Sequence, residues 1–294
     1  MKIGVVVVNR NDGYKDFERG LIHFKSMLDT FDEVNYIDWN SPKGSYLWEI
    51  ENHLPKTGKV KHFIIPPEIV EQIIKAPNAQ QCNEGLSRNI GIRRSDCDWV
   101  ISTNLDIIPP KREDLEQLIS NLDPNIFYTV SRREAPKDIV YKHGHENWEQ
   151  LREELYNTIP ERHFPAMVSP NDNFSLINCC GDFQLAHKNV WDKIKGFEEE
   201  MVYACFVDTN IQKKAVLNGF GLQALYNPPL FHMEHGAYYT KEDGTRILDS
   251  ENKGAFKGDN KAYNDVWKYV EYFHQTTNTE DWGLGSIEIE YEIF

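Results

Sequence analysis

Residues 98–108 read "DWVISTNLDII", an apolar run that passes directly into the polar turn Asn104-Leu105-Asp106. The run predicts a buried strand that ends on the turn. In an open α/β sheet, ligands collect at the carboxyl ends of the strands, where turns and helix N-termini meet. Residues 9–12 and 38–41 also follow apolar runs. We therefore expect three polar strand ends to meet in one site.

In the first half of the chain, runs typical of strands alternate with runs typical of helices, which predicts an α/β fold with a parallel sheet flanked by helices. The second half is less regular. The expected strands are residues 2–8, 33–39, 60–65, 98–108, 127–133, 174–185, 222–226 and the edge strand 286–294. The expected helices are residues 14–31, 46–53, 68–75, 83–95 (despite two glycines), 147–156, 187–197, 206–217 and 263–273. Loops are expected at 164–173, 230–236 and 238–259, and the whole chain, 1–294, is expected to form one domain.

Composition excludes several classes of protein. The net charge of −14 disfavours a protein that binds nucleic acid by neutralising phosphates. No apolar run reaches the roughly 20 residues of a membrane span. The five cysteines are odd in number and lack CxxC spacing, which favours reduced thiols and a cytoplasmic location. A nicotinamide oxidoreductase is disfavoured because no GxGxxG follows the first strand.

Asp106, in the pattern Asn104-x-Asp106, is a candidate metal ligand. A carboxylate at a strand end can hold Mg²⁺ or Mn²⁺ against a diphosphate. The alternative is a turn aspartate that precedes Pro109-Pro110. His232 and His235, in "LFHMEHG" (residues 230–236), form either a ligand pair or two polar loop residues. A zinc enzyme would more often show three strong protein ligands.

Two carboxylates are candidates for a general base. Asp208 lies near the start of an expected helix, where the helix dipole favours the ionised form, so we expect its pKa not to be raised. The alternative for Asp208 is an ordinary first-turn acid. Asp182, which follows Gly181, is the second candidate.

The order of these motifs resembles the glycosyltransferases of the GT-A fold, specifically the family 2-like and β-1,4-galactosyltransferase-like enzymes that use nucleotide sugars. The resemblance covers most of residues 2–236 and implies an α/β fold with a mixed, mostly parallel central sheet flanked by helices. "VVVVNRND" (5–12) looks like the first strand with its nucleotide-contacting turn, which contains Asn9 and Arg10. "YIDWNSPKGS" (36–45) looks like the second strand, whose Asp38 would meet the base.

Three further segments are similar to parts of those enzymes. "GLSRNIGIRRSDCDWVISTNLDIIPP" (85–110) resembles the helix and strand that lead to the DxD motif, with Asn104 in place of the first aspartate. "CCGDFQLAHKNVWDKIKGFEEEM" (179–201) resembles the acceptor-side strand and helix. "FVDTNIQKKAVLNGFG" (206–221) resembles the next helix and puts Asp208 on the catalytic-base position, although the acids often found beside it are missing.

The resemblance implies transfer of a sugar from a nucleoside-diphosphate sugar to a hydroxyl of a carbohydrate or glycoconjugate acceptor, with inversion. Asp106, His232 and His235 would hold Mn²⁺ or Mg²⁺, Asp208 would take the acceptor proton, and Arg88 would approach the diphosphate unless it forms a structural salt bridge. Residues 1–108 would bind the donor and residues 109–236 the acceptor, followed by a C-terminal loop, helix and tail, 237–294.

Two other classes stay open at this point. One is a catalytically inactive GT-A-like protein that binds a carbohydrate or nucleotide, because Asn104 replaces an aspartate and Asp208 lacks neighbouring acids. The other is a nucleotidyltransferase, which would normally show a glycine-rich, basic phosphate loop after the first strand. "NRNDGYKD" (residues 9–16) is not such a loop.

Overall fold

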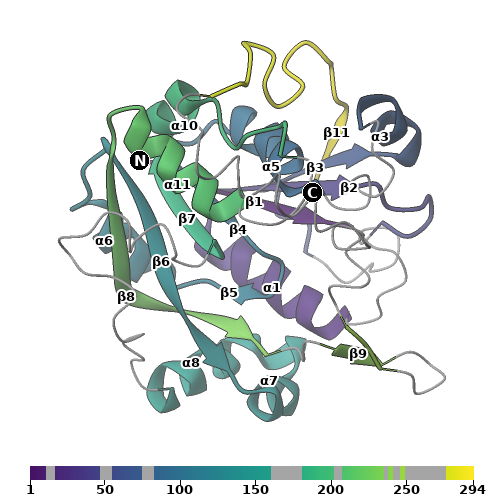
Figure 1. Cartoon of the computed structure of the whole chain (residues 1–294). Coiled ribbons are helices and arrows are strands. Elements are labelled where there is room, and N and C mark those ends of the chain that lie inside the picture. Colours follow the sequence, from purple (N-terminus) through teal and green to yellow (C-terminus); the bar gives the residue numbers. More distant parts are fainter. Residues whose placement is uncertain are drawn as a thin grey trace.

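The computed structural model describes residues 1–10, 17–46, 55–74, 83–159, 181–201, 207–234, 238–240, 246–248 and 276–294 (Figure 1). Its main feature is a nine-stranded sheet with helices on both faces. Within these residues, no helix has the length and apolar character needed to cross a membrane.

Parallel strands form the N-terminal half of the sheet: β1 (Ile3–Asn9), β2 (Glu33–Trp39), β3 (Val60–Ile65) and β4 (Trp99–Thr103). They lie in the order β3-β2-β1-β4. Parallel neighbours need crossover connections, and the helices of these connections are α1 (Phe17–Thr30), α3 (Pro67–Ile73) and α5 (Glu84–Arg93). The expected bounds of β2 and β3 are confirmed.

The second half of the sheet is mixed. Beyond β4 come β7 (Phe183–His187), β6 (Ile126–Ala135), β8 (Gly221–Met233) and β5 (Ile107–Ile108). Only β6 and β8 pair in parallel, whereas the contacts β4–β7, β7–β6 and β8–β5 are antiparallel. On the opposite edge, β11 (Tyr291–Ile293) pairs antiparallel with β3, which confirms the expected C-terminal edge strand. A separate two-stranded sheet consists of β9 (Tyr238–Thr240) and β10 (Arg246–Leu248), so the prediction of a loop at 238–259 is wrong for these residues.

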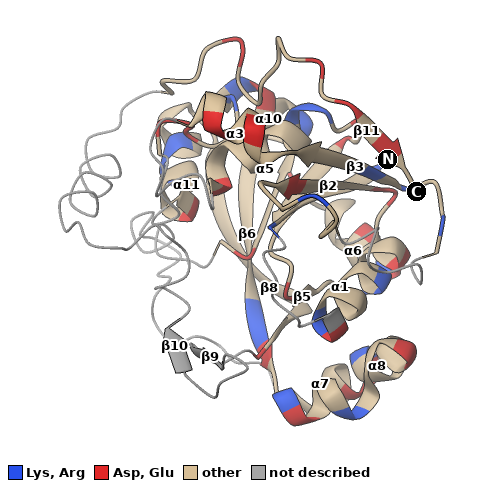
Figure 2. Cartoon of the chain, turned by 90° about the vertical axis from the view of Figure 1, so that its right-hand side faces the viewer, with Lys and Arg blue, Asp and Glu red and all other residues tan. Residues whose placement is uncertain are grey.

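The remaining helices of the described residues are α6 (Arg112–Ile119), α7 (Lys137–His143), the 3₁₀ helix η1 (His145–Asn147), α8 (Trp148–Thr158), α10 (Lys188–Ile194) and α11 (Val207–Leu217). One apolar core joins α3, α5, α10 and α11 to one face of the sheet, and a second joins α1 and α6 to the other. A third, smaller core lies between α1, α7 and α8, and Figure 2 shows α7 and α8 below α1.

Helix α5 packs very close to β1. A Cβ at Gly91 would lie 2.6 Å from Cγ1 of Val6, so only glycine fits at this crossing. A glycine inside a helix costs about 1 kcal/mol relative to alanine. The close contact with the sheet explains why the expected helix at 83–95 forms in spite of its glycines.

Several predicted strands have different bounds, and two of them differ in a way that affects the site. Residues 98–108 form two strands, because β4 ends at Thr103 and β5 pairs with β8 instead. The strand expected at 222–226 continues to Met233, so Leu230–Met233 is strand and the prediction of a loop is wrong there. The Pro228-Pro229 pair falls where the β6–β8 register shifts, between the partner positions Val130 and Arg132. A bulge tolerates proline because the ladder is already interrupted.

Other expectations differ at the ends of elements or lie outside the described residues. The expected helices that became α1, α3, α5, α8, α10 and α11 are confirmed with shifts of a few residues. The short helices α6 and α7 were not predicted. The helix at 263–273, the loop at 164–173 and most of the helix at 46–53 lie outside the described residues.

Candidate functional site

Polar side chains from neighbouring strands meet along the edge of the sheet that is formed by the carboxyl ends of β1, β2 and β4. Strands β1, β2 and β4 run in parallel, so Asn9, Asp38 and Asn104 follow or end them on the same side. Strand β7 runs antiparallel to β4, with Phe183 opposite Thr103, so Asp182 lies at the same edge. The structure therefore brings these sequence-predicted residues to a common edge.

Asn104 joins a helix to a strand through its amide. Its Nδ2 donates to Oδ1 of Asp182 at 2.6 Å, and its Oδ1 accepts from NH2 of Arg88 at 2.6 Å. Arg88 also donates to Oγ of Ser102 at 2.8 Å and lies 3.4 Å from Glu84. An amide both donates and accepts, whereas an ionised carboxylate only accepts. An aspartate at position 104 would therefore place two carboxylates in contact.

A second group of side chains comes from the neighbouring strands β8 and β6 and from the turn before β5. His232 on β8 lies opposite Ile107 on one side and Glu134 on the other. Its Nε2 is 3.2 Å from Oδ2 of Asp106, and its Nδ1 is 2.6 Å from Oε2 of Glu134. The backbone N–H of Met233 donates to the carbonyl oxygen of Asp106 at 2.8 Å. The structure thus brings Asp106 and His232 together, while His235 lies outside the described residues.

Arg132 connects the two groups. Its guanidinium bonds to Oε1 of Glu134 at 2.9 Å and pairs with Oδ2 of Asp182. Figure 2 shows the basic stretch of β6, in blue, that contains Arg132. We name the resulting series the contact chain, which runs in order through Glu84, Arg88, Asn104, Asp182, Arg132, Glu134, His232 and Asp106.

Three members of the contact chain, Glu84, Arg132 and Glu134, were missed by sequence reasoning. A usable signal existed for two of them. "SRREAP" (residues 131–136) continues the apolar run of β6 into charged residues, which is the same kind of strand end that identified Asn104. Glu84 carried no such signal, since a first-turn acid is common in helices.

Asp106 and His232 fit a divalent ion. Ligands of Mg²⁺ lie about 2.1 Å from the ion, so two neighbouring ligands of an octahedron are about 3 Å apart. The 3.2 Å between Asp106 and His232 is close to that spacing. A carboxylate suits Mn²⁺ or Mg²⁺, and the added imidazole favours Mn²⁺. Within the described part of the chain, no three His, Cys, Asp or Glu side chains form a metal cluster, so further ligands must come from elsewhere.

The protonation of His232 opposes metal binding at low pH. Burial alone would lower the pKa of His232, but its hydrogen bonds to Asp106 and Glu134 outweigh burial and raise the pKa. Only the neutral imidazole is a metal ligand. A metal ion bound between Asp106 and His232 would therefore replace the imidazolium proton.

Asp208 lies in the first turn of α11, as expected, but the expectation about its pKa is wrong. Burial raises the pKa of Asp208, and the negative charges of Glu84 and Asp182 add to the effect. A hydrogen bond from the N–H of Thr209 and the charge of Arg88 act in the opposite direction. Removal of the carboxyl group from water thus outweighs the helix dipole at this position.

Close packing fixes the position of Asp208 beside the contact chain. Nε2 of Gln184 donates to the carbonyl oxygen of Asp208 at 3.0 Å. A Cβ added at Gly181 would overlap the Cβ of Asp208. Gly181 therefore permits Asp208 to approach the turn that contains Asp182.

The candidate donor-binding residues lie at the carboxyl ends of β1 and β2. They are Asn9, Arg10 and Asp38. Arg10 donates to the carbonyl oxygen of Asn40 at 3.2 Å. Asp38 is fully buried, and its Oδ2 lies 3.5 Å from Nε2 of His62.

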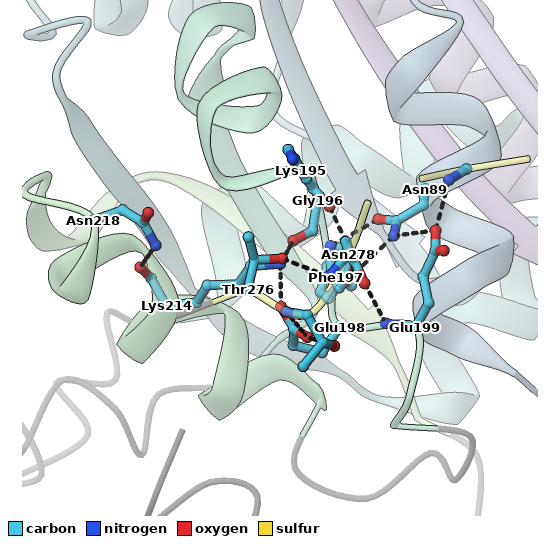
Figure 3. Close-up of polar contacts among 12 residues, drawn as sticks. Asn89, Lys195, Gly196, Phe197, Glu198, Glu199, Lys214, Asn218, Thr276 and Asn278 are labelled. Atoms are coloured by element: carbon cyan, nitrogen blue, oxygen red, sulfur yellow. Dashed lines mark hydrogen bonds and ion pairs between the residues drawn. The ribbon is translucent and has the colours of Figure 1, made fainter. Parts of the chain in front are cut away.

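The helices that contain Arg88 and Asp208 are anchored to the same turn, residues 195–199 (Figure 3). From α5, Asn89 donates to the carbonyl oxygen of Phe197 at 2.8 Å. From α11, Lys214 forms a fully buried ion pair of 2.5 Å with Glu198. The second oxygen of Glu198 accepts from the N–H and hydroxyl of Thr277. The C-terminal segment therefore helps to fix both helices relative to each other.

No family model matches this chain, and no curated protein sequence matches it. Solved structures match it by fold. The mannosyltransferase PcManGT from Pyrobaculum calidifontis, in complex with GDP-Man and Mn²⁺, has a TM-score of 0.50 and 11% identity, covering 97% of this chain and 72% of its own. S. aureus TarS 1-349 in complex with UDP has a TM-score of 0.48 and 15% identity over 80% of this chain.

The chain spans 61% of the length of that TarS structure. TarS 1-349 in complex with UDP-GlcNAc matches with a TM-score of 0.48 and 15% identity, covering 86% of this chain and 69% of its own. At these identities the likeness concerns the fold. The likeness to PcManGT, together with the mixed central sheet flanked by helices, confirms the GT-A fold, whereas the β-1,4-galactosyltransferase-like subdivision stays a prediction.

The contact chain predicts the result of restoring an aspartate at position 104. Asn104→Asp replaces the donor to Asp182 with a second carboxylate, so we expect the free energy of unfolding to fall by about 1–3 kcal/mol. Urea denaturation at neutral pH measures the change. Asn121→Asp is the matched control, because the exposed Asn121 also donates through Nδ2, to the carbonyl oxygen of Gln117 at 2.8 Å. An Asn104→Asp protein that is as stable as the control would contradict this interpretation.

Proposed function

We propose that this protein is a metal-dependent, inverting glycosyltransferase. It transfers a sugar from a nucleoside-diphosphate sugar to a hydroxyl group of a carbohydrate or glycoconjugate acceptor. The proposal rests on one observation: Asp106 and His232 lie 3.2 Å apart at the carboxyl edge of a GT-A sheet. A hard oxygen ligand beside an imidazole at a ligand-binding edge suits an ion that holds a diphosphate.

Asp106 and His232 are the described residues that would hold the ion, with His235 as a further predicted ligand. A bound Mn²⁺ or Mg²⁺ supplies Lewis-acid stabilisation of the negative charge that develops on the leaving diphosphate. Arg88, which lies at the same edge and is bonded to Asn104, adds positive charge near this group.

Asp208 is the proposed general base. Its carboxylate takes the proton from the acceptor hydroxyl while the acceptor oxygen forms a bond to the anomeric carbon. The bond from that carbon to the diphosphate oxygen breaks on the opposite face, and its electron pair leaves with the nucleoside diphosphate. Asp182 is less suited to this role, because both of its oxygens are already engaged, one by Asn104 and the other by Arg132. We assign Asp182 to the positioning of Asn104.

The donor nucleoside is assigned to the β1–β2 side of the edge, where Asn9, Arg10 and Asp38 lie. The buried carboxylate of Asp38 can accept hydrogen bonds from a base or ribose. GDP-Man with Mn²⁺, the combination bound to PcManGT, and UDP-GlcNAc, bound to TarS, are the first donors to test here. Because the sheet takes strands from both halves of the chain and from the C-terminal tail, we propose that residues 1–294 act as one unit.

A donor screen tests the proposed function. Thermal shift in the presence of Mn²⁺ is measured for GDP-, UDP-, CDP- and ADP-sugars. A donor at 100 times its dissociation constant stabilises the protein by about 2.7 kcal/mol, so at least one donor should raise Tm by several degrees. Asp106→Asn should remove the part of the shift that depends on Mn²⁺. Failure of every donor to stabilise the protein would rule out the transferase.

Substitution of Asp208 tests the base. Asp208→Asn should lower kcat about 10²- to 10⁴-fold and leave the donor-induced thermal shift unchanged. Burial raises the pKa of Asp208, and only the ionised form accepts a proton, so kcat of the unaltered protein should fall as the pH drops through a pKa above the ordinary value for aspartate.

Two variants accompany this test. Asp138→Asn is the matched control, because Asp138 is also a first-turn acid, of the distant helix α7. Gly181→Ala should lower kcat as well, since its methyl group displaces Asp208. Full turnover by Asp208→Asn would show that the base is elsewhere, with Asp182 as the next candidate.

A further inference from the structure

Each ring nitrogen of His232 contacts a different carboxylate. Nε2 is 3.2 Å from Asp106, which precedes β5, and Nδ1 is 2.6 Å from Glu134 on β6. The two carboxylates are not equivalent. Asp106 lies at the turn that follows β4, whereas Glu134 is the cross-strand partner of His232 within the sheet. Backbone pairing therefore fixes the contact between Glu134 and His232.

An imidazole that binds a metal must present one unprotonated nitrogen to it. When the other nitrogen donates its proton to a carboxylate, the tautomer and the orientation of the ring are both fixed. With Nδ1–H donating to Glu134, the lone pair of Nε2 faces Asp106. This arrangement leaves Nε2 as the nitrogen that can bind an ion together with Asp106.

Glu134 is itself fixed on its other oxygen. Oε1 bonds to Nε of Arg132 at 2.9 Å, and the same guanidinium pairs with Asp182. Both oxygens of Glu134 are thus engaged within the protein, one by Arg132 and one by His232. Glu134 is consequently suited to orient a ligand, and it would have to leave these partners to become a ligand itself.

We infer that Glu134 is a positioning residue for the metal site, which fixes the tautomer and direction of His232 so that Nε2 and Asp106 bind one ion. This inference rests on the proposed function and extends it to a residue that does not touch the ion. Through Arg132, Glu134 also connects the proposed metal-binding side chains to Asp182, in the middle of the contact chain.

The chain contains a matched control for the Glu134–His232 contact. Nε2 of His143 lies 2.6 Å from Oε2 of Glu154, which is the same separation as between His232 and Glu134. This second pair joins α7 to α8, away from the edge of the sheet that contains Asp106. Glu154→Ala therefore removes a similar histidine–glutamate contact without affecting the proposed site.

The test is a Mn²⁺ titration of the full chain, followed by the electron paramagnetic resonance signal of the free ion. It is performed with Mn²⁺ alone and with saturating GDP or UDP. Loss of a carboxylate that orients a metal-binding histidine typically weakens metal affinity by about 10- to 100-fold, and we expect this loss for Glu134→Ala. Glu154→Ala should bind Mn²⁺ as the unaltered protein does. Glu134→Gln, whose amide oxygen can still accept from Nδ1–H, should recover part of the affinity.

A second measurement separates positioning from misfolding. The ¹⁵N chemical shifts of the His232 ring report its tautomer without any metal, and circular dichroism reports the fold. In the unaltered protein at a pH where His232 is neutral, the proton should reside on Nδ1. In a folded Glu134→Ala protein, the carboxylate of Asp106 still lies beside Nε2, so the proton should move to Nε2.

The outcomes distinguish this inference from the proposed function. Failure of the unaltered protein to bind Mn²⁺, with or without nucleotide, would overturn the metal site and the proposed function together. Binding by the unaltered protein that Glu134→Ala leaves within about threefold of the Glu154→Ala control would overturn the role of Glu134 alone, because an orienting carboxylate accounts for at least about tenfold.

Discussion

The side-chain amide of Asn104 is the interaction on which the arrangement of the site depends. It donates to Asp182 and accepts from Arg88, both at 2.6 Å. These two bonds connect helix α5 and the end of β4 to the start of β7, which is distant in the sequence, since Asn104 and Asp182 are 78 positions apart. No carboxylate can make both, since an ionised carboxylate has no proton to donate. The departure from the DxD pattern at this position therefore has a structural reason, and it leaves Asp106 as the carboxylate available for an ion.

From Asn104 the contact chain continues with alternating charge. Asp182 pairs with Arg132, Arg132 with Glu134, and Glu134 with His232 beside Asp106. Along the whole contact chain, the carboxylates outnumber the guanidinium groups. The remaining negative charge is concentrated where Asp106 and Glu134 flank His232. A divalent cation would compensate this charge, whereas in its absence the same two carboxylates favour the protonated imidazole.

Much of the fold and part of the site could be predicted from local patterns. The bounds of β2 and β3 followed from the apolar residues of short runs, and the polar residues after β4 identified Asn104 and Asp106. The pairing of Asp106 with His232 was expected only through the resemblance to the GT-A enzymes. Sequence reasoning missed Glu134, because its contact with His232 depends on the register of β6 and β8 after a bulge. A register between distant strands is a tertiary property that no local pattern specifies.

The error about Asp208 has a related cause. The position of Asp208 in the first turn of α11 was predicted correctly, and a helix dipole alone would stabilise its ionised form. Its pKa is raised because β7 and the turn at Gly181 pack against it and exclude water. The extent of burial at a helix end depends on which elements pack there, and that follows from the assembled sheet.

If His232 and Asp106 hold a divalent ion beside the diphosphate of a donor, Mn²⁺ bound to the protein with GDP or UDP would be close to both phosphorus and an imidazole nitrogen. Electron–nuclear double resonance measures both contacts. We expect ³¹P couplings from the diphosphate together with a ¹⁴N coupling from a directly bound imidazole, and we expect His232→Ala to reduce the nitrogen coupling. A spectrum with phosphorus couplings but no nitrogen coupling would mean that His232 does not bind the ion, and would contradict the proposed site.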